Sequence, residues 1–227
     1  MGDYFLYYGL LFFSVIITLG AQCFVSFAYN KYRGVKNDRG ITGAEAARYL
    51  LDKHGLSDIE VVPIKGYLND HYDPRNKVIR LSSANYFGNS IASVAVSCHE
   101  CGHALQDKDD YFFMRIRESL IPVISFFSYL GYVAILLGCF FGSINLIWIG
   151  ILAEVAILLF QIITLPVEVD ASKRALKELD YAHFFNSREL KSGKVVLRAA
   201  AMTYIASIAT AVIEIFRLLL LFGRRDD

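Results

Sequence analysis

Residues Ser90–Asp107 read SIASVAVSCHECGHALQD, and the structure expected for the rest of the chain depends on this stretch. His99 and His103 lie four residues apart, so on an α-helix both imidazoles project from one face. Two histidines in this arrangement can bind one zinc ion, and Glu100, next to the first of them, has the position of a general base. The stretch therefore predicts a helix that carries part of a metal site.

The composition indicates that this helix belongs to a membrane protein. Of the 227 residues, 55% are hydrophobic, and the mean hydropathy is +0.41, which is high for a soluble domain. The net charge of +1 gives no electrostatic footprint for nucleic acid, so nucleic acid is not expected as a partner. Two of the four cysteines fall inside hydrophobic runs, which indicates reduced thiols rather than a disulfide framework.

Hydrophobic segments divide the chain into membrane spans and polar segments. Residues 4–30 contain no charge, and no basic segment precedes them as it would in a cleaved signal peptide. The last hydrophobic segment reaches spanning length only by including Glu214 and Arg217, so a helix lying in the membrane interface is its alternative. The predicted segments are 4–30 (first span), 31–118 (cytoplasmic α+β unit with the histidine helix), 119–142 (second span), 144–166 (third span), 167–198 (cytoplasmic helix) and 199–222 (fourth span).

The basic residues give the expected orientation. Lys31 and Arg33 follow the first span, whereas no basic residue precedes it. Because cytoplasmic segments of membrane proteins carry an excess of lysine and arginine, the N-terminus is expected outside and residues 31–118 inside. The second and third spans form a hairpin that leaves and returns on one side, which would bring Glu168 to the side of the histidine helix.

Short elements are expected within the cytoplasmic unit. Thr42 and Glu45 have the spacing of a capping box at the start of a helix. Residues 59–64 and 77–81 are rich in β-branched residues and predict a short antiparallel sheet, while residues 70–76 have the composition of a turn.

A catalytic zinc ion usually has three protein ligands and a water, so one ligand must come from elsewhere in the chain. Glu168 is the candidate, because a carboxylate at the edge of a span is costly unless a metal or a cation balances it. The alternative is that Glu168 only marks the end of the span and pairs with Lys173 or Arg174. The residues by themselves leave both interpretations open.

Three separated motifs, HECGHALQ at residues 99–106, NDHYDPRNKVIRLS at 69–82 and LPVEVDASKRAL at 165–176, resemble the YugP-type neutral zinc metallopeptidases, which are bacterial membrane proteins. More distantly, the chain is similar to the gluzincins, including the HtpX and CAAX prenyl protease group. Their third ligand is a glutamate on a later helix, which implies Glu168 here. Those relatives place an aspartate four residues after this ligand, where this chain has Ser172. Asp170 or Ser172 could therefore supply the hydrogen bond to a ligand histidine.

Residues and resemblance together predict an α-helical integral membrane protein with a small α+β zincin-like cytoplasmic unit built around the HExxH helix. One Zn²⁺ per chain would be held by His99, His103 and Glu168, while Glu100 would take a proton from water and deliver it to the leaving amine. Candidate donors to the oxyanion are His71, His183, Arg198 and Tyr204. The candidate strand for pairing with an extended substrate consists of Val78, Ile79, Arg80 and Leu81.

The expected function is that of a zinc metalloendopeptidase in the bacterial plasma membrane, with a cytoplasmic active site. Its substrates would be membrane-associated or unfolded polypeptides, and another membrane protein or a second copy of the chain could be a partner. A site-2-type intramembrane protease and a membrane adaptor or scaffold with a structural or vestigial zinc site stay open. Cys98 and Cys101 are expected to pack in the core, because four groups on one helix cannot converge on one ion.

Overall fold

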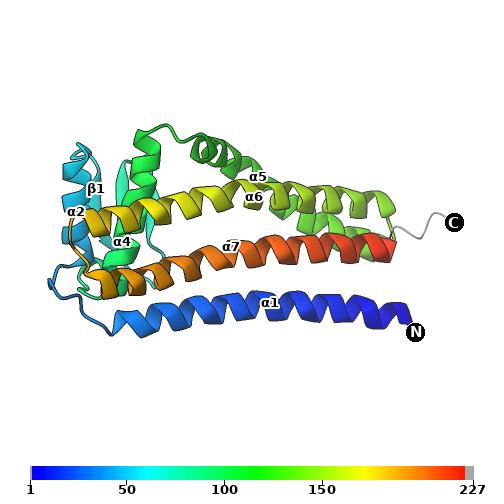
Figure 1. Ribbon diagram of the computed structural model, residues 1–227. Helices are drawn as coiled ribbons and strands as arrows, with labels where there is room; N and C mark the ends of the chain where they lie inside the picture. Colours follow the sequence, from blue (N-terminus) through cyan, green and yellow to red (C-terminus); the bar gives the residue numbers. More distant parts are fainter. Residues whose placement is uncertain (1, 223–227) are drawn as a thin grey trace. The chain divides into compact units, whose positions relative to one another are not determined.

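The computed structural model describes residues 2–222, which form mainly helices and one small sheet (Figure 1). The elements are α1 (Gly2–Arg33), α2 (Gly43–Lys53), β1 (Glu60–Ile64), β2 (His71–Asp73), β3 (Val78–Ser82), α3 (Ser83–Tyr86), α4 (Ile91–Lys108), α5 (Phe112–Phe141), α6 (Ile144–Tyr181) and α7 (Ser187–Phe222). They form two compact units. The membrane unit comprises Met1–Gln22, Arg115–Leu165 and Thr203–Asp227, and the sheet unit comprises Cys23–Met114 and Pro166–Met202.

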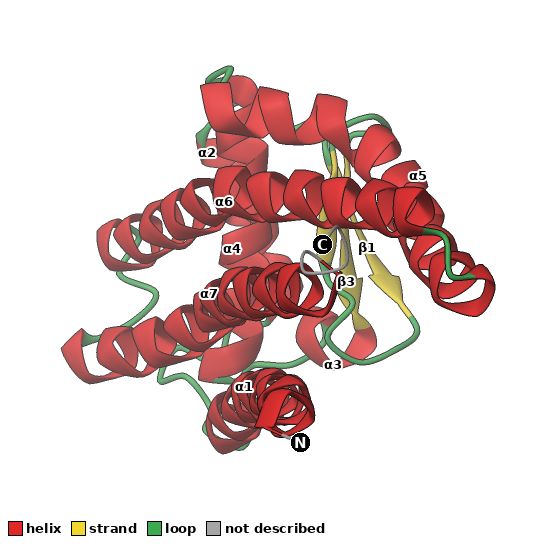
Figure 2. Ribbon diagram, turned by 90° about the vertical axis from the view of Figure 1, so that its right-hand side faces the viewer, coloured by secondary structure: helices red, strands yellow, loops and turns green. Residues whose placement is uncertain are grey.

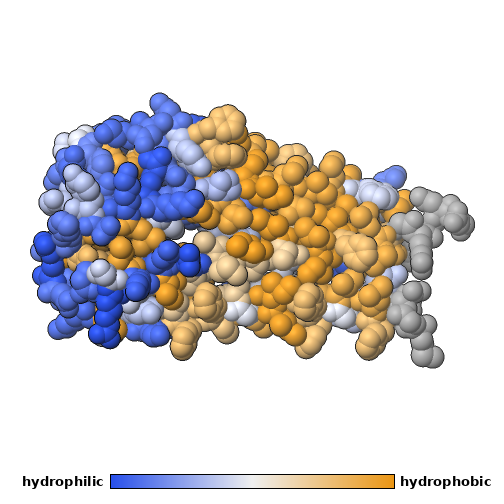
Figure 3. Space-filling view, in the orientation of Figure 1, coloured by the Kyte–Doolittle hydropathy of each residue, from blue (hydrophilic) through white to orange (hydrophobic). Residues whose placement is uncertain are grey.

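The membrane unit consists of parts of the four long helices, α1, α5, α6 and α7. Each of these helices is long and apolar enough to cross a membrane. The face of the unit seen in Figure 3 is mostly hydrophobic, as expected for helices whose side chains contact lipid. A Cβ atom added to Gly131 would lie 2.5 Å from the Cβ of Ala153, so α5 and α6 approach closely through small residues.

The helix bounds differ from the expected spans, and the division into domains stays a prediction. Helix α6 does not end at Pro166 but continues to Tyr181, and α7 begins at Ser187 rather than at residue 199. Beyond the proline, α6 buries Val167, Ala171, Ala175 and Leu179, which recur every four residues along one face. The fall in hydropathy after Pro166 therefore does not mark the end of α6. It marks the point beyond which one face of the helix packs against the protein core.

The sheet of the second unit has the order β1-β3-β2, and its strands are drawn in yellow in Figure 2. Strand β2 is antiparallel to β3, but β1 is parallel to β3, so the expectation of a purely antiparallel sheet is wrong. Parallel neighbours need a crossover of about a dozen residues or more, which residues 65–77 supply. This crossover contains β2, which the turn-like composition of residues 70–76 concealed.

The capping box predicted at the start of α2 is confirmed. The Thr42 side chain accepts from the Glu45 backbone N–H, and the Glu45 carboxylate accepts from the Thr42 N–H at 2.7 Å. These bonds satisfy amides that the first helical turn leaves unpaired and so define where α2 begins.

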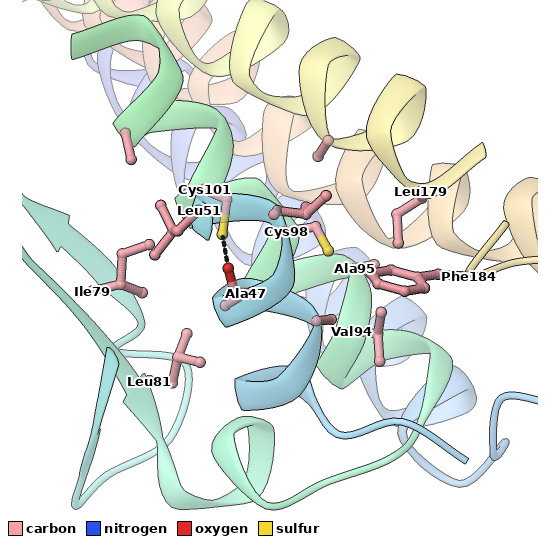
Figure 4. Close-up of a cluster of buried hydrophobic side chains, with 14 of the residues drawn as sticks. Ala47, Leu51, Ile79, Leu81, Val94, Ala95, Cys98, Cys101, Leu179 and Phe184 are labelled. Atoms are coloured by element: carbon pink, nitrogen blue, oxygen red, sulfur yellow. Dashed lines mark hydrogen bonds between the residues drawn. The ribbon is translucent and has the colours of Figure 1, made fainter. Parts of the chain in front are cut away.

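The core of the sheet unit lies between α2, α4, β3 and the end of α6, and Figure 4 shows its buried side chains. Cys98 and Cys101 belong to this cluster as free thiols, and the Cys101 sulfur lies 3.6 Å from the carbonyl oxygen of Ala47. The predicted packing role of both cysteines is confirmed. The residues of this core cluster that are labelled in Figure 4 are Ala47, Leu51, Ile79, Leu81, Val94, Ala95, Cys98, Cys101, Leu179 and Phe184.

Gly102 sets the distance between α4 and α6. A Cβ atom at this position would lie 2.5 Å from the backbone oxygen of Ala171, a contact that no side-chain rotation could relieve. Because Gly102 lies next to His103, and Ala171 lies three residues after Glu168, this close approach brings the histidine helix against the segment that carries Glu168.

We predict that Gly102→Ala forces α4 and α6 apart. The added methyl group is expected to cost about 1–3 kcal/mol of folding stability, which outweighs the gain in helix propensity of about 1 kcal/mol. The purified variant should melt at a lower temperature and retain less metal. Gly20→Ala is the matched control, because no atom of the described part of the chain lies within 4 Å of the added methyl group. Unchanged melting and metal content in Gly102→Ala would contradict the prediction.

Candidate metal centre

Helix α4 presents the histidine pair from a fixed and buried position. Its N-cap is Ser90, whose hydroxyl accepts from the Ser93 N–H at 3.0 Å, and the helix runs to Lys108. Both His99 and His103 are buried. The i,i+4 spacing places the two rings on one face, with their centroids 4.7 Å apart.

Glu168 of α6 meets this pair. Its Oε2 atom lies 3.3 Å from His99 Nε2 and 3.7 Å from His103 Nε2, and one ligand atom from each of the three buried residues lies within 4.8 Å of the others. Two atoms that bind one zinc ion at about 2.0–2.1 Å with a tetrahedral angle lie about 3.3 Å apart. A charge-assisted hydrogen bond would be shorter, at about 2.7–2.9 Å. The donor set and its spacing therefore fit a zinc ion held by two imidazoles and a carboxylate.

The hydrogen bonds of Gln106 determine which nitrogen of His103 carries the proton. The Gln106 amide nitrogen donates to the Val167 carbonyl at 2.8 Å and to Asp170 Oδ2 at 2.9 Å, so its oxygen faces His103 Nδ1 at 3.0 Å. An amide oxygen can only accept, so Nδ1 is the protonated nitrogen. This leaves the lone pair of Nε2 directed at the position shared with Glu168.

Ser172 and Asp170 each contact a histidine, one directly and the other through Gln106. The Ser172 hydroxyl lies 3.2 Å from His99 Nδ1, whereas Asp170 reaches His103 only by way of the Gln106 amide. Arg174, the alternative partner for Glu168, instead pairs with Asp170 and Asp109. Both Nδ1 atoms thus have a hydrogen-bonding partner, and both Nε2 atoms face Glu168.

Glu100 lies beside the cluster and is held by the sheet. Its Oε2 atom accepts a hydrogen bond from the backbone N–H of Tyr72 in β2 at 3.0 Å. Burial raises the pKa of Glu100 to about 7, while the neighbouring His99 acts in the opposite direction. A carboxyl group with a pKa near neutrality can both accept and release a proton.

The strand proposed for substrate pairing has to be corrected. Strand β3, which contains Val78, Ile79, Arg80 and Leu81, is the central strand of the sheet. It pairs with β1 along its whole length and with β2 over residues 78–80. Its backbone groups over residues 78–80 are therefore used on both sides and cannot add an extended peptide. The edge strand that contacts Glu100 is β2.

Three of the candidate oxyanion donors, His71, His183 and Arg198, lie at exposed positions within the described residues. His71 lies on β2, with Nδ1 2.9 Å from the Asn69 carbonyl. Within residues 2–222, none of these three makes a hydrogen bond or an ion pair to His99, His103 or Glu168. Tyr204 belongs to the membrane unit, and its role stays a prediction.

Gln106 and Tyr72 were missed as site residues. Gln106 could have been found, because it follows His103 by three residues and so lies on the same helical face. Tyr72 could not, because it contributes a backbone N–H from a strand that the sequence pattern does not reveal.

We predict that Gln106→Leu weakens metal binding without removing a ligand. The variant leaves His103 Nδ1 without its hydrogen-bond partner in a buried place and removes the bond that Gln106 makes to the Val167 carbonyl. Loss of such a supporting residue typically lowers metal affinity 10–100-fold. Competition for zinc with a chelator of known affinity measures the change. Ser172→Ala, which removes a longer contact, should have a smaller effect; equal zinc affinity in Gln106→Leu and the wild type would contradict the role of Gln106.

Comparison with known proteins agrees with the geometry of this site. Over 223 residues, which cover 96% of this chain and 99% of the relative, the sequence is 41% identical to "Putative membrane protease YugP" of Bacillus subtilis (strain 168). No solved structure matches the chain. Residues 7–223 match the family described as "Putative neutral zinc metallopeptidase". By both matches, the chain belongs to this family.

Proposed function

We propose that the protein is a membrane zinc metalloendopeptidase that hydrolyses peptide bonds of membrane-associated or unfolded polypeptides, and that its sheet unit is zincin-like. The observation that carries the proposal is the convergence of His99 Nε2, His103 Nε2 and Glu168 Oε2, with Glu100 beside them. Two imidazoles and one carboxylate form the ligand set of a catalytic zinc site, which keeps one position open for water and substrate.

Different residues of this chain would have different roles in hydrolysis. A zinc ion bound here would polarise the scissile carbonyl and make water acidic enough to act as a nucleophile at neutral pH. Glu100 takes the proton of the attacking water and passes it to the amine nitrogen as the peptide bond breaks. The Tyr72 N–H holds the Glu100 carboxylate in place, and Gln106 and Ser172 keep the two imidazoles oriented.

We further propose that the site faces the cytoplasm of a bacterial cell, with the N-terminus outside. Basic residues follow the first hydrophobic segment and recur in residues 167–198, as in cytoplasmic segments of membrane proteins. The similarity to a bacterial membrane protease over nearly the whole chain supports the same localisation.

The two other classes are less well supported. In a site-2-type protease the histidine helix would itself be a span, but among residues 2–222 the candidate spans are α1, α5, α6 and α7, and α4 is not one of them. A scaffold with a vestigial site would have no use for a buried carboxylate next to the histidines, because burial of an ionisable group is costly. Glu100 is such a group.

We predict that Glu100→Gln and Glu168→Ala separate catalysis from metal binding. Glu100→Gln should retain zinc but lose cleavage of a labelled unfolded protein, because general base catalysis contributes about 10²–10⁴-fold. Glu168→Ala should lose zinc and therefore activity. Bound zinc is measured on the purified proteins together with the cleavage rate.

Glu60→Gln serves as the control for both variants, because it removes an exposed carboxylate of β1 in the same unit. Cleavage by Glu100→Gln at the control rate would refute the base role. Full zinc content in Glu168→Ala would remove Glu168 from the ligand set.

The orientation is tested by cysteine accessibility in intact cells. In a background in which the two exposed cysteines, Cys23 and Cys139, are replaced by serine, single cysteines at positions 2 and 145 should react with a membrane-impermeant reagent. A cysteine at the exposed position 60 should react only after the cells are broken. Protection of position 2 or 145 in intact cells would overturn the proposed orientation.

A further inference from the structure

The membrane unit contains a polar cavity that the peptidase site does not use. The cavity has a volume of about 260 Å³ and lies where α1, α6 and α7 meet. A cavity of this size has room for a small ion with several waters, each of which occupies about 30 Å³ in the liquid. Its lining residues are Ser14, Glu154, Ile157, Gln161, Ser207, Thr210, Ala211 and Glu214.

The polar residues of the cavity are aligned by helical spacing. Glu154 and Gln161 of α6 lie seven residues apart, and the same interval separates Ser207 from Glu214 of α7, so each pair lies on one helical face two turns apart. Hydrophobic residues occupy most of the remaining surface of both helices in this unit. The polar groups are therefore gathered on one side of each helix rather than scattered.

Glu154 is the one charged residue of the chain between Ser119 and Val167. The nearest cation along the cavity helices, Arg217, already pairs with Glu214, whose Oε2 accepts from Arg217 Nε at 2.8 Å. Within residues 2–222, Glu154 itself makes no hydrogen bond or ion pair. A carboxylate in a membrane span is costly unless a proton or another cation neutralises it.

The other polar groups of the cavity offer lone pairs rather than protons. The Oε1 atom of Gln161 is buried and accepts no hydrogen bond within the described part of the chain. The Ser14 hydroxyl donates its proton to the Leu11 carbonyl at 2.8 Å, and the Thr210 hydroxyl donates to the Ser207 carbonyl at 3.0 Å. Hydroxyl oxygens that donate to their own helix keep free lone pairs, so the lining favours a cation over an anion.

We propose that this cavity binds one monovalent metal cation, Na⁺, between the Glu154 carboxylate, the Gln161 amide oxygen and the hydroxyl oxygens of α7 that line the same cavity. The charges of Glu154, Glu214 and Arg217 sum to −1, which one monovalent ion neutralises and a divalent ion would overcompensate. Carboxylate, amide and hydroxyl oxygens are the ligands that hard cations prefer. The bound ion joins α6 to α7 and so stabilises the membrane unit.

The experiment measures thermal unfolding of the purified full-length protein in detergent at fixed pH. Sodium chloride is exchanged for N-methylglucamine chloride at constant ionic strength, so only the identity of the cation changes. The wild type is expected to unfold several degrees higher in sodium, on the order of 3–6 °C when the ion is at about ten times its Kd. Equal midpoints in the two salts would refute the proposal.

Two variants assign the effect to the cavity. Glu154→Gln keeps the shape but removes the charge, so it should lose the sodium shift and be at least as stable as the wild type without sodium. Gln161→Leu should shift the sodium dependence to higher concentrations. Glu60→Gln, outside the membrane unit, should keep the full shift. A sodium shift that persists in Glu154→Gln would also refute the proposal.

A proton could neutralise Glu154 in place of sodium. Repeating the sodium comparison at several pH values distinguishes the two ligands. If sodium is the ligand, protons compete with it, and the sodium shift becomes smaller as the pH falls. Stability that depends on pH but never on sodium would assign the site to a proton and overturn the proposal. Because the readout is stability alone, a negative result leaves the proposed peptidase activity untouched.

Discussion

The candidate site depends on the contact between the buried Glu168 carboxylate and the imidazoles of His99 and His103. A charge in this place is costly unless a metal ion or another cation balances it, and here the Nε2 atoms of both imidazoles are directed toward the same position. The arrangement requires α4 and α6 to touch, which they do because Gly102 has no side chain to hold Ala171 away. Packing between two helices and the electrostatics of the site are therefore parts of one constraint.

The hydrogen bonds around the cluster show how the rest of the sheet unit supports it. Gln106 joins His103 of α4 to Val167 and Asp170 of α6, so a single amide both orients an imidazole and links the two helices. Strand β2 contributes the N–H that holds Glu100. The small sheet thus has a role beyond packing, because it fixes the carboxylate that the proposed mechanism uses as a base.

The membrane unit has its own polar centre. Its helices are apolar enough to span a bilayer, yet α6 and α7 each carry a glutamate into the same cavity. Among residues 2–222, Glu214 pairs with Arg217, and Glu154 has no arginine partner. An unbalanced charge of this kind is expensive in a span, which is why it points to a ligand rather than to packing.

The sequence by itself determined the features that depend on local periodicity: the apolar helices, the capping box of α2, and the histidine helix with both imidazoles on one face. It also offered Glu168 as a candidate ligand from its position at the edge of a span, and the resemblance to a family favoured that interpretation. The tertiary structure decided the parallel pairing of β1, the strand within the turn-like segment, and the partners of Glu100 and His103. The physical reason is the separation along the sequence of the groups that interact, because the pattern that predicts a helix repeats within a few residues. Strand order and the links from Tyr72 and Gln106 instead depend on which backbone and side-chain groups meet after distant segments have packed.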